Sequence, residues 1–225
     1  MFTRADNTWN SERIAKYLEV LDQIEASEGP GVMITLGTGK RHFSTGFDLP
    51  FWAAKVSNME ESILEFDEVM ARLLQFSMPT MCIFNGTAYA GGLIWGLCHD
   101  YRIMNAKVGG MCLSELKLGL PLPLPYMLVC RAKMSPVVCT KWSLAITCDV
   151  KEGIKDGVID DVYESPEDLE AKMKTFVKRF AQMGSMRLAI KTNKLNQFSS
   201  TIDGCRSFKW TPILHELNKK NHVLI

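Results

Sequence analysis

Short apolar runs alternate with helical patterns along this chain, and this alternation restricts the possible folds more than any other feature. The runs are four or five residues long, which is typical of buried strands, and they lie at 32–36, 81–84 and 101–104. No internal repeat, low-complexity tract or long linker interrupts the pattern. A chain of 225 residues with this pattern is predicted to be an α/β protein built around one main core.

Three segments carry the spacing or the start signals of helices. Residues 11–26 place apolar side chains at helical spacing, and Gly29-Pro30-Gly31 follows as a stop. Residues 59–76 form the clearest amphipathic pattern. Ser165-Pro166-Glu167-Asp168 combines a capping serine, a proline at the first helical position and an acid at the third, so we expect a helix from there to about Met183.

Composition excludes several classes of partner. Lysine and arginine total 26 against 25 for aspartate and glutamate, so no net field favours nucleic acid or an anionic membrane. The 7 cysteines form no C-x-x-C pair and several lie in apolar stretches, which favours buried thiols in a reducing compartment. No window approaches about 18 uninterrupted apolar residues, so we expect no membrane span. The N-terminus lacks the apolar core of a signal peptide.

The stretch RHFSTGFDLP, residues 41–50, follows the first apolar run and contains a glycine where the chain must turn. Gly46 allows backbone angles that other residues resist, so the turn can expose the next amide, which belongs to Phe47. In isolation the stretch also fits a plain strand-to-helix turn in which Gly46 serves geometry alone.

The stretch NGTAYAGGLIWGLCHD, residues 85–100, places two glycines where a loop enters a helix. The start of a helix presents N–H groups without partners, which attract an anion or oxyanion, although paired glycines also permit close packing alone. The spacing does not fit a dinucleotide motif or a P-loop. Two strand ends would each supply one amide, at Phe47 and at Gly91, and two converging amides form an oxyanion hole.

The stretch MCLSELKLGLPLP, residues 111–123, contains one carboxylate among apolar neighbours. If Glu115 is buried there, desolvation raises its pKa towards the range that suits proton transfer. The alternative is an exposed carboxylate or one paired with Lys117. The histidines show no metal-ligand spacing, so we expect no metal site.

Together these stretches resemble the crotonase superfamily, the enoyl-CoA hydratase/isomerase fold. The resemblance rests on Phe43 to Leu49, Pro79 to Gly92, His99 to Arg102, and Ser114-Glu115 with Gly119 and Pro121 after it. It implies a spiral of ββα units and a homotrimer or hexamer. It also implies an acyl-CoA thioester as substrate, no separate cofactor, and a carbonyl oxygen bound between the amides of Phe47 and Gly91.

The resemblance further implies contacts with the substrate from residues that flank the motifs. They are Arg41, Phe43, Thr45, Gly46, Asp48, Ala90, Gly92 and Ile94. Arg41 is the candidate partner for a phosphate of the substrate. The Phe47 ring either lines the acyl pocket or packs in the core.

The number of acids indicates which reaction to expect within this superfamily. Hydratases carry two glutamates, whereas here the first position is Ile94 and only Glu115 remains. One glutamate suits the proton shuttle of the Δ3,Δ2-enoyl-CoA isomerases in unsaturated fatty acid β-oxidation. The alternatives are a family member without catalysis that serves as a subunit of a larger assembly, and another acyl-CoA reaction that would need a second polar group near Ile94.

The resemblance also predicts how the chain is organised. Residues 1–160 are expected to form the crotonase-like core, and residues 161–225 a helical C-terminal region of the same domain used in oligomerisation. Relatives open with a strand pair, whereas only Met1 to Trp9 precede the first helix here, so we expect an uncovered edge of the first sheet. The C-terminus is not a peroxisomal S-K-L signal, and the pathway predicts a mitochondrial or peroxisomal location.

Overall fold

The computed structural model describes residues 6–39, 41–54 and 59–209, and its strands form two parallel sheets. The strands are β1 (Met33–Leu36), β2 (His42–Ser44), β3 (Thr80–Phe84), β4 (Thr87–Tyr89), β5 (Tyr101–Asn105), β6 (Met111–Cys112) and β7 (Asp161–Tyr163). The strand order is β1-β3-β5-β7 in the larger sheet and β2-β4-β6 in the smaller one.

Helices follow the strands in each turn of the chain. They are α1 (Ser11–Glu25), α2 (Leu49–Ala54), α3 (Met59–Leu74), α4 (Gly91–Leu97), α5 (Leu124–Lys133), α6 (Pro136–Ser143), α7 (Val150–Lys155), α8 (Pro166–Phe180) and α9 (Arg187–Ser207), with 3-10 turns η2 (Glu115–Leu118) and η3 (Met183–Ser185). Consecutive strands enter different sheets before the next helix, as in β1-β2-α2, β3-β4-α4 and β5-β6-η2. This is the predicted spiral of ββα units.

Each face of the larger sheet is buried against a different layer. On one face Met81, Ile83 and Ile103 pack with Phe176 of α8. The alternate residues of the same strands, including Phe84, join the main core on the other face. The sheet is therefore buried on both sides, which is why its strands appear in the sequence as continuous apolar runs.

The predicted helices form with nearly the expected limits. The N-terminal helix spans Ser11–Glu25. The amphipathic pattern of 59–76 forms α3, and its apolar face is buried at Ile63, Phe66, Met70, Leu73 and Leu74. At α8 the Ser165 side chain accepts from the Asp168 amide at 3.2 Å, and Pro166 takes the first helical position, as predicted. The helix ends at Phe180, slightly before the expected Met183.

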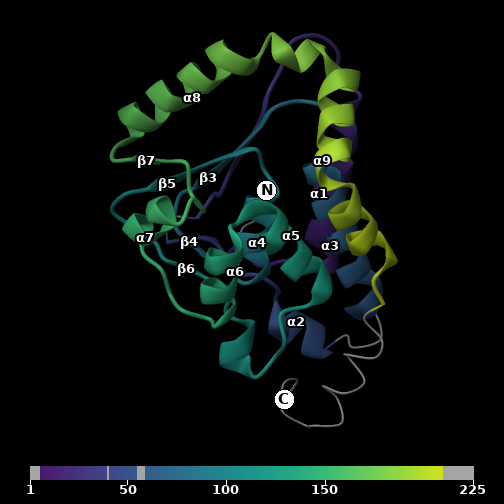
Figure 1. Cartoon of the computed structure of the whole chain (residues 1–225), viewed down its shortest axis with the longest axis vertical. Helices are drawn as coiled ribbons and strands as arrows, with labels where there is room; N and C mark the ends of the chain where they lie inside the picture. Colours follow the sequence, from purple (N-terminus) through teal and green to yellow (C-terminus); the bar gives the residue numbers. More distant parts are fainter. Residues whose placement is uncertain (1–5, 40, 55–58, 210–225) are drawn as a thin grey trace.

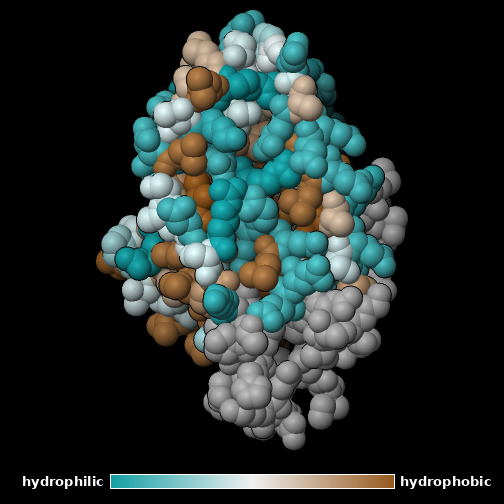
Figure 2. Space-filling view, turned by 90° about the vertical axis from the view of Figure 1, so that its right-hand side faces the viewer, coloured by the Kyte–Doolittle hydropathy of each residue, from teal (hydrophilic) through white to brown (hydrophobic). Residues whose placement is uncertain are grey.

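The C-terminal helices cover the core from two sides. In Figure 1, α8 crosses one end of the molecule and α9 runs down one side. The face beside α9 is mainly hydrophilic and carries apolar residues in separate patches (Figure 2). The predicted boundary at residue 160 falls just before β7, which pairs with β5, so the two predicted regions share one sheet. Residues 210–225 of the C-terminal region lie outside the described residues.

The larger sheet ends at β1, which pairs only with β3 among the described strands. Within the part of the chain that the structure describes, β1 is therefore an edge strand of this sheet. No helix among the described residues is long and apolar enough to cross a membrane.

Candidate active site

Three neighbouring parallel strands of the smaller sheet lead into the three residues predicted to act on the substrate. β2 leads to Phe47, β4 to Gly91 and β6 to Glu115. β4 lies in the middle and pairs in parallel with both neighbours. Because the carboxyl ends of parallel strands lie at one edge of a sheet, the loops that carry these residues meet there.

The first candidate donor is the backbone amide of Phe47. Gly46 adopts φ +89, a conformation that favours glycine, and turns the chain after β2. The Gly46 carbonyl accepts from the Trp9 amide at 2.8 Å, and the Asp48 amide donates to the Trp9 carbonyl at 2.8 Å. Alternate residues of an extended chain direct their backbone groups to opposite sides, so the Phe47 amide points away from Trp9. It has no backbone acceptor among the described residues.

The second candidate donor is the backbone amide of Gly91 at the start of α4. Ala90 precedes it with φ 48 and ψ −132, an uncommon conformation for a residue with a Cβ atom. The Ala90 amide donates to the Cys112 carbonyl at 2.9 Å, and its carbonyl accepts from Leu93 and Ile94 in the first turn of α4. These bonds fix Ala90 and leave the Gly91 amide without a backbone acceptor in the described chain. Such strain at a fixed position is typical of functional sites.

Glycine at positions 46 and 92 allows these segments to approach each other. A Cβ atom at Gly46 would lie 3.2 Å from the backbone nitrogen of Gly91. A Cβ atom at Gly92 would lie 2.5 Å from the Ser44 carbonyl oxygen, which is too close for any other residue. The two amides that the sequence predicts for an oxyanion hole are thus carried by loops in direct contact.

Glu115 is the first residue of η2 and is buried, with 9% of its surface exposed. Its Oε2 atom has no hydrogen-bond partner among the described residues. Burial raises the pKa of its carboxyl group to about 7, and a hydrogen bond from its own backbone amide offsets this rise only in part. This is the perturbed carboxylate that the apolar sequence context predicted.

Lys117 does not neutralise Glu115. Its ammonium group donates to Thr147 Oγ1 at 2.7 Å instead. The alternative of a surface carboxylate paired with this lysine is therefore contradicted. An unpaired, buried carboxylate near neutral pKa is suited to accept and return a proton.

Phe66 of α3 joins the surroundings of the three loops. Its ring lies 5.1 Å from the Phe47 ring, and a Cβ atom at Gly91 would lie 3.6 Å from its edge. Its ring is also 6.2 Å from that of Tyr126, whose hydroxyl interacts electrostatically with Glu115. Sequence reasoning did not single out Phe66 or Tyr126, because both fit the ordinary apolar pattern of a helix.

The residues predicted to contact substrate take different places in the fold. Arg41 is exposed, and its carbonyl accepts from the Thr87 amide at 3.1 Å. Asp48 is buried and accepts from the Phe51 amide at 3.2 Å, so it caps α2. The Thr45 amide donates to the Asp6 carbonyl at 3.2 Å. Ile94 is fully buried in the main core.

Phe43 is also almost fully buried, and its ring stacks on that of Trp95 at 4.9 Å. Gly46, Ala90 and Gly92 shape the two amide loops, as described above. Contact between these predicted residues and a substrate stays a prediction.

His99 and Asp100, which lie side by side in sequence, serve the fold and do not form a dyad. His99 Nε2 is 2.8 Å from Thr35 Oγ1. Asp100 accepts from the Thr80 amide at 2.9 Å and from Lys194 Nζ at 2.5 Å. In the described residues no group of three or more metal-ligating side chains is clustered for a metal ion.

Comparison with known proteins identifies the family to which the chain belongs. The family model described as enoyl-CoA hydratase/isomerase matches residues 2–210. The chain therefore belongs to the enoyl-CoA hydratase/isomerase family, and the fold predicted from the three motifs is confirmed.

Relatives within the family include isomerases and hydratases. Enoyl-CoA delta isomerase 3 of Arabidopsis thaliana is 33% identical over 163 residues, which cover 69% of this chain and 68% of that protein. The peroxisomal enoyl-CoA delta isomerase 2 of the same plant is 31% identical over 72% of this chain and 71% of its own. The crystal structure of an enoyl-CoA hydratase from Bacillus halodurans superposes with a TM-score of 0.77 at 18% identity, covering 97% of this chain and 93% of that one.

Proposed function

We propose that the chain is an isomerase that moves the double bond of a 3-enoyl-CoA to the trans-2 position during unsaturated fatty acid β-oxidation. The proposal is supported by the close approach of the Gly46 and Gly91 backbones, whose loops carry two amides without backbone acceptors in the described chain, and by the buried Glu115 carboxylate that follows the neighbouring strand of the same sheet. The names of the Arabidopsis relatives support the same reaction.

In the proposed mechanism Glu115 acts first as a base and then as an acid. Its carboxylate removes a proton from C2 of the thioester, and the electron pair moves into a dienolate whose oxygen carries the negative charge. The amides of Phe47 and Gly91 donate to that oxygen. Glu115 then returns the proton to C4, so the double bond moves and the carboxylate is regenerated. Donors fixed before the reaction stabilise the developing charge without reorganisation.

The environment of Glu115 suits both steps. A carboxyl group with a pKa of about 7 is partly ionised near neutral pH and also able to give the proton back. A fully exposed carboxylate would be a weaker base, and one held in an ion pair would resist protonation.

Ile94 supports isomerisation over hydration. Its side chain is aliphatic and fully buried in the core, so it supplies no second acid beside Glu115. Hydration of a double bond needs both activation of water and protonation of the neighbouring carbon. One carboxylate that takes and returns a single proton is sufficient for isomerisation.

A spectrophotometric assay with 3-hexenoyl-CoA tests the proposal directly. We expect wild-type protein to form the trans-2 isomer and Glu115→Gln to lose at least about a hundredfold in kcat. The control is Glu164→Gln, which changes an exposed carboxylate outside the site and should leave kcat unaltered. Folded wild-type protein without turnover would favour the non-catalytic alternative, and an unchanged rate in Glu115→Gln would remove this residue from its role.

The location and the assembly belong to the same proposal. Two relatives, the peroxisomal enoyl-CoA delta isomerases 1 and 2 of Arabidopsis thaliana, favour the peroxisome over the mitochondrion. A homotrimer or hexamer is proposed from the family, and light scattering of the purified protein distinguishes either one from a monomer.

A further inference from the structure

The charged residues of this chain are unevenly distributed, although their totals nearly balance. Residues 171–202, which run from α8 through η3 into α9, contain no aspartate or glutamate. The cations in this stretch are Lys172, Lys174, Lys178, Arg179, Arg187, Lys191 and Lys194. Within it, residues 177–191 form the turn between α8 and α9 at one end of the molecule (Figure 1), and we call them the α8–α9 corner.

The cations of the corner are not neutralised by neighbouring acids. Three lysines of the stretch form ion pairs with acids outside it, and these pairs are Lys172 with Asp161, Lys174 with Glu170, and Lys194 with Asp100. The remaining cations form no ion pair in the described chain, and they are Lys178, Arg179, Arg187 and Lys191. All except Arg187 are exposed. The corner therefore carries a local positive field.

Contacts with the loop that follows α1 fix the position of the corner. Arg187 Nη2 donates to Ser27 Oγ at 3.3 Å. A Cβ atom at Gly184 would overlap the Gly31 carbonyl oxygen, so η3 packs directly on this loop. The loop brings one exposed acid, Glu28, to the neighbourhood of the cations. The net charge of this end of the molecule is still positive.

Large apolar side chains are exposed at the same corner. They are Val177, Met183, Met186 and Leu188, with exposed fractions of 40%, 48%, 58% and 80%. Leu188 and Lys191 are three residues apart in α9, so they lie on one face of this helix. Figure 2 shows apolar residues among hydrophilic ones at the upper end of the face beside α9. A group of exposed apolar side chains is typical of an interaction surface.

We propose that the α8–α9 corner docks on the surface of an anionic lipid bilayer. Met183, Met186 and Leu188 enter the boundary between the headgroups and the acyl chains, and the unpaired cations lie at the level of the phosphates. Exposed apolar side chains flanked by lysine and arginine are the combination that an anionic membrane surface binds.

The charge distribution disfavours other partners for this surface. Two copies that met corner to corner would bring their unpaired cations against one another. A nucleic acid would attract the cations, but its phosphate backbone offers no partner for Met186 or Leu188. A lipid surface accommodates both the cations and the apolar side chains.

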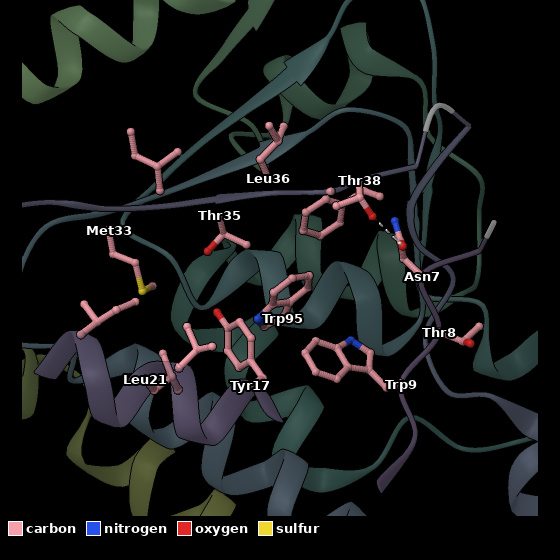
Figure 3. Close-up of a pocket in the computed structure, with 15 residues that line it drawn as sticks. Asn7, Thr8, Trp9, Tyr17, Leu21, Met33, Thr35, Leu36, Thr38 and Trp95 are labelled. Carbon is pink, nitrogen blue, oxygen red and sulfur yellow. Dashed lines mark hydrogen bonds between the residues drawn. The ribbon is translucent and has the colours of Figure 1, made fainter. Parts of the chain in front are cut away.

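The cavity of about 210 Å³ between α1 and β1 lacks the same combination of groups. Figure 3 shows Tyr17 of α1 near Thr35 and Trp95, and its hydroxyl forms hydrogen bonds with both side chains. The side chains that line the cavity are uncharged. An anionic group would therefore find no counter-charge there.

Flotation of the full chain with lipid vesicles tests the proposal. One set of vesicles contains phosphatidylcholine alone, and the other contains phosphatidylcholine mixed with phosphatidylserine. We expect binding to the mixed vesicles, weaker binding as salt is added, and little binding to phosphatidylcholine alone. In Lys178→Gln/Lys191→Gln the partition coefficient should fall about fivefold for each lysine removed.

Two controls separate the corner from general effects of charge and hydrophobicity. Lys151→Gln/Lys155→Gln removes the same charge from exposed lysines of α7 and should leave binding almost unchanged. Leu188→Gln should lower the partition coefficient about tenfold. Val137→Gln changes a similarly exposed side chain of α6, 79% exposed, and should have little effect.

Every outcome bears on the proposal, because the substituted side chains are exposed and thermal unfolding establishes that each variant is folded. Absence of binding to the mixed vesicles, equal binding to both sets, or equal losses in the two lysine variants would overturn it. A smaller oligomer in Leu188→Gln, measured by light scattering, would make the corner an interface between copies and would also overturn it. Binding is measured without substrate, so the result does not depend on the isomerase assay.

Discussion

Gly46 and Ala90 approach so closely that a Cβ atom on Gly46 would lie 3.0 Å from the Cβ atom of Ala90. Both residues have positive φ, at +89 and 48 respectively, and each precedes one of the two proposed oxyanion donors. The position of one donor therefore depends on the backbone that carries the other.

The close contact predicts that Gly46→Ala strongly reduces activity. A side chain at φ +89 costs about 1 to 2 kcal/mol, and relief of the contact with Ala90 moves the Phe47 amide away from the thioester oxygen. We expect kcat to fall about a hundredfold, as for other small displacements of catalytic groups. The steady-state assay with 3-hexenoyl-CoA measures this loss.

Gly29 provides the matched control for this change. Its φ of +82 is similar, but nothing lies within 4 Å of the position of a Cβ atom. Gly29→Ala should therefore lower the thermal stability by a similar backbone cost and leave kcat intact. Equal losses of activity in both variants would show that backbone strain alone, and not the contact with Ala90, is responsible.

The pKa of Glu115 predicts the pH dependence of catalysis. The carboxyl group must be ionised to remove the first proton, and its pKa is raised to about 7 by burial. We expect kcat/KM to rise tenfold per pH unit below about pH 7 and to level off above it. An inflection near the ordinary glutamate value of 4.5 would mean that the reacting acid is not buried as described here.

The same burial predicts that Glu115 reduces stability at alkaline pH. Its pKa is higher in the folded state than in the unfolded state, so folding disfavours the ionised form, and stability falls as the pH rises from about 4.5 to about 7. Above pH 7, Glu115→Gln should be more stable than wild type by up to about 3 kcal/mol. Urea unfolding at pH 8 and at pH 4 measures the difference, which should disappear at the lower pH.

The sequence predicted three strands of the larger sheet, β1, β3 and β5, but not β7, and it predicted the smaller sheet poorly. Strands β3 and β5 are buried on both faces, so each appears as an apolar run, and the edge strand β1 is apolar although it is only partly buried. Strands β4 and β6 span only Thr87–Tyr89 and Met111–Cys112, which is too short to establish a two-residue period. Their presence was implied only by the resemblance to a known family.

The C-terminal helix α9 was also weakly indicated by the sequence. Its buried side includes Lys194 and Thr201 as well as Phe198 and Ile202, so polar residues interrupt the apolar stripe. Lys194 is buried because its ammonium group binds Asp100 and the Met78 carbonyl. A long-range pairing of this kind is invisible to local periodicity.

At the candidate site, the sequence indicated which residues to consider. The structure added their backbone conformations and their hydrogen-bond partners. Gly46, Gly91 and Glu115 were identified from their local context. The unusual backbone of Ala90 was not predictable, because alanine rarely adopts positive φ. The binding of Lys117 to Thr147 was likewise hidden, since the two residues are far apart in sequence.

Substitutions at position 47 separate the backbone of this residue from its side chain. The Phe47 ring packs on Trp52 and Phe66, at centroid distances of 6.0 and 5.1 Å, whereas the proposed catalytic role belongs to the amide alone. Phe47→Ala keeps the amide, so we expect kcat within about tenfold of wild type and a lower melting temperature from the lost ring contacts. Phe47→Pro removes the N–H, and kcat should fall by about 10² to 10³.

The comparison of these two variants is informative only when both are folded, which circular dichroism and thermal unfolding establish. Because the Phe47 amide has no backbone acceptor among the described residues, proline removes no backbone hydrogen bond known to stabilise the fold. If the folded proline variant kept the activity of the alanine variant, the oxyanion would have to be stabilised without the Phe47 amide. In that case the Gly91 amide would be the remaining main-chain donor of the proposed pair, and the contact between the two loops would serve packing alone.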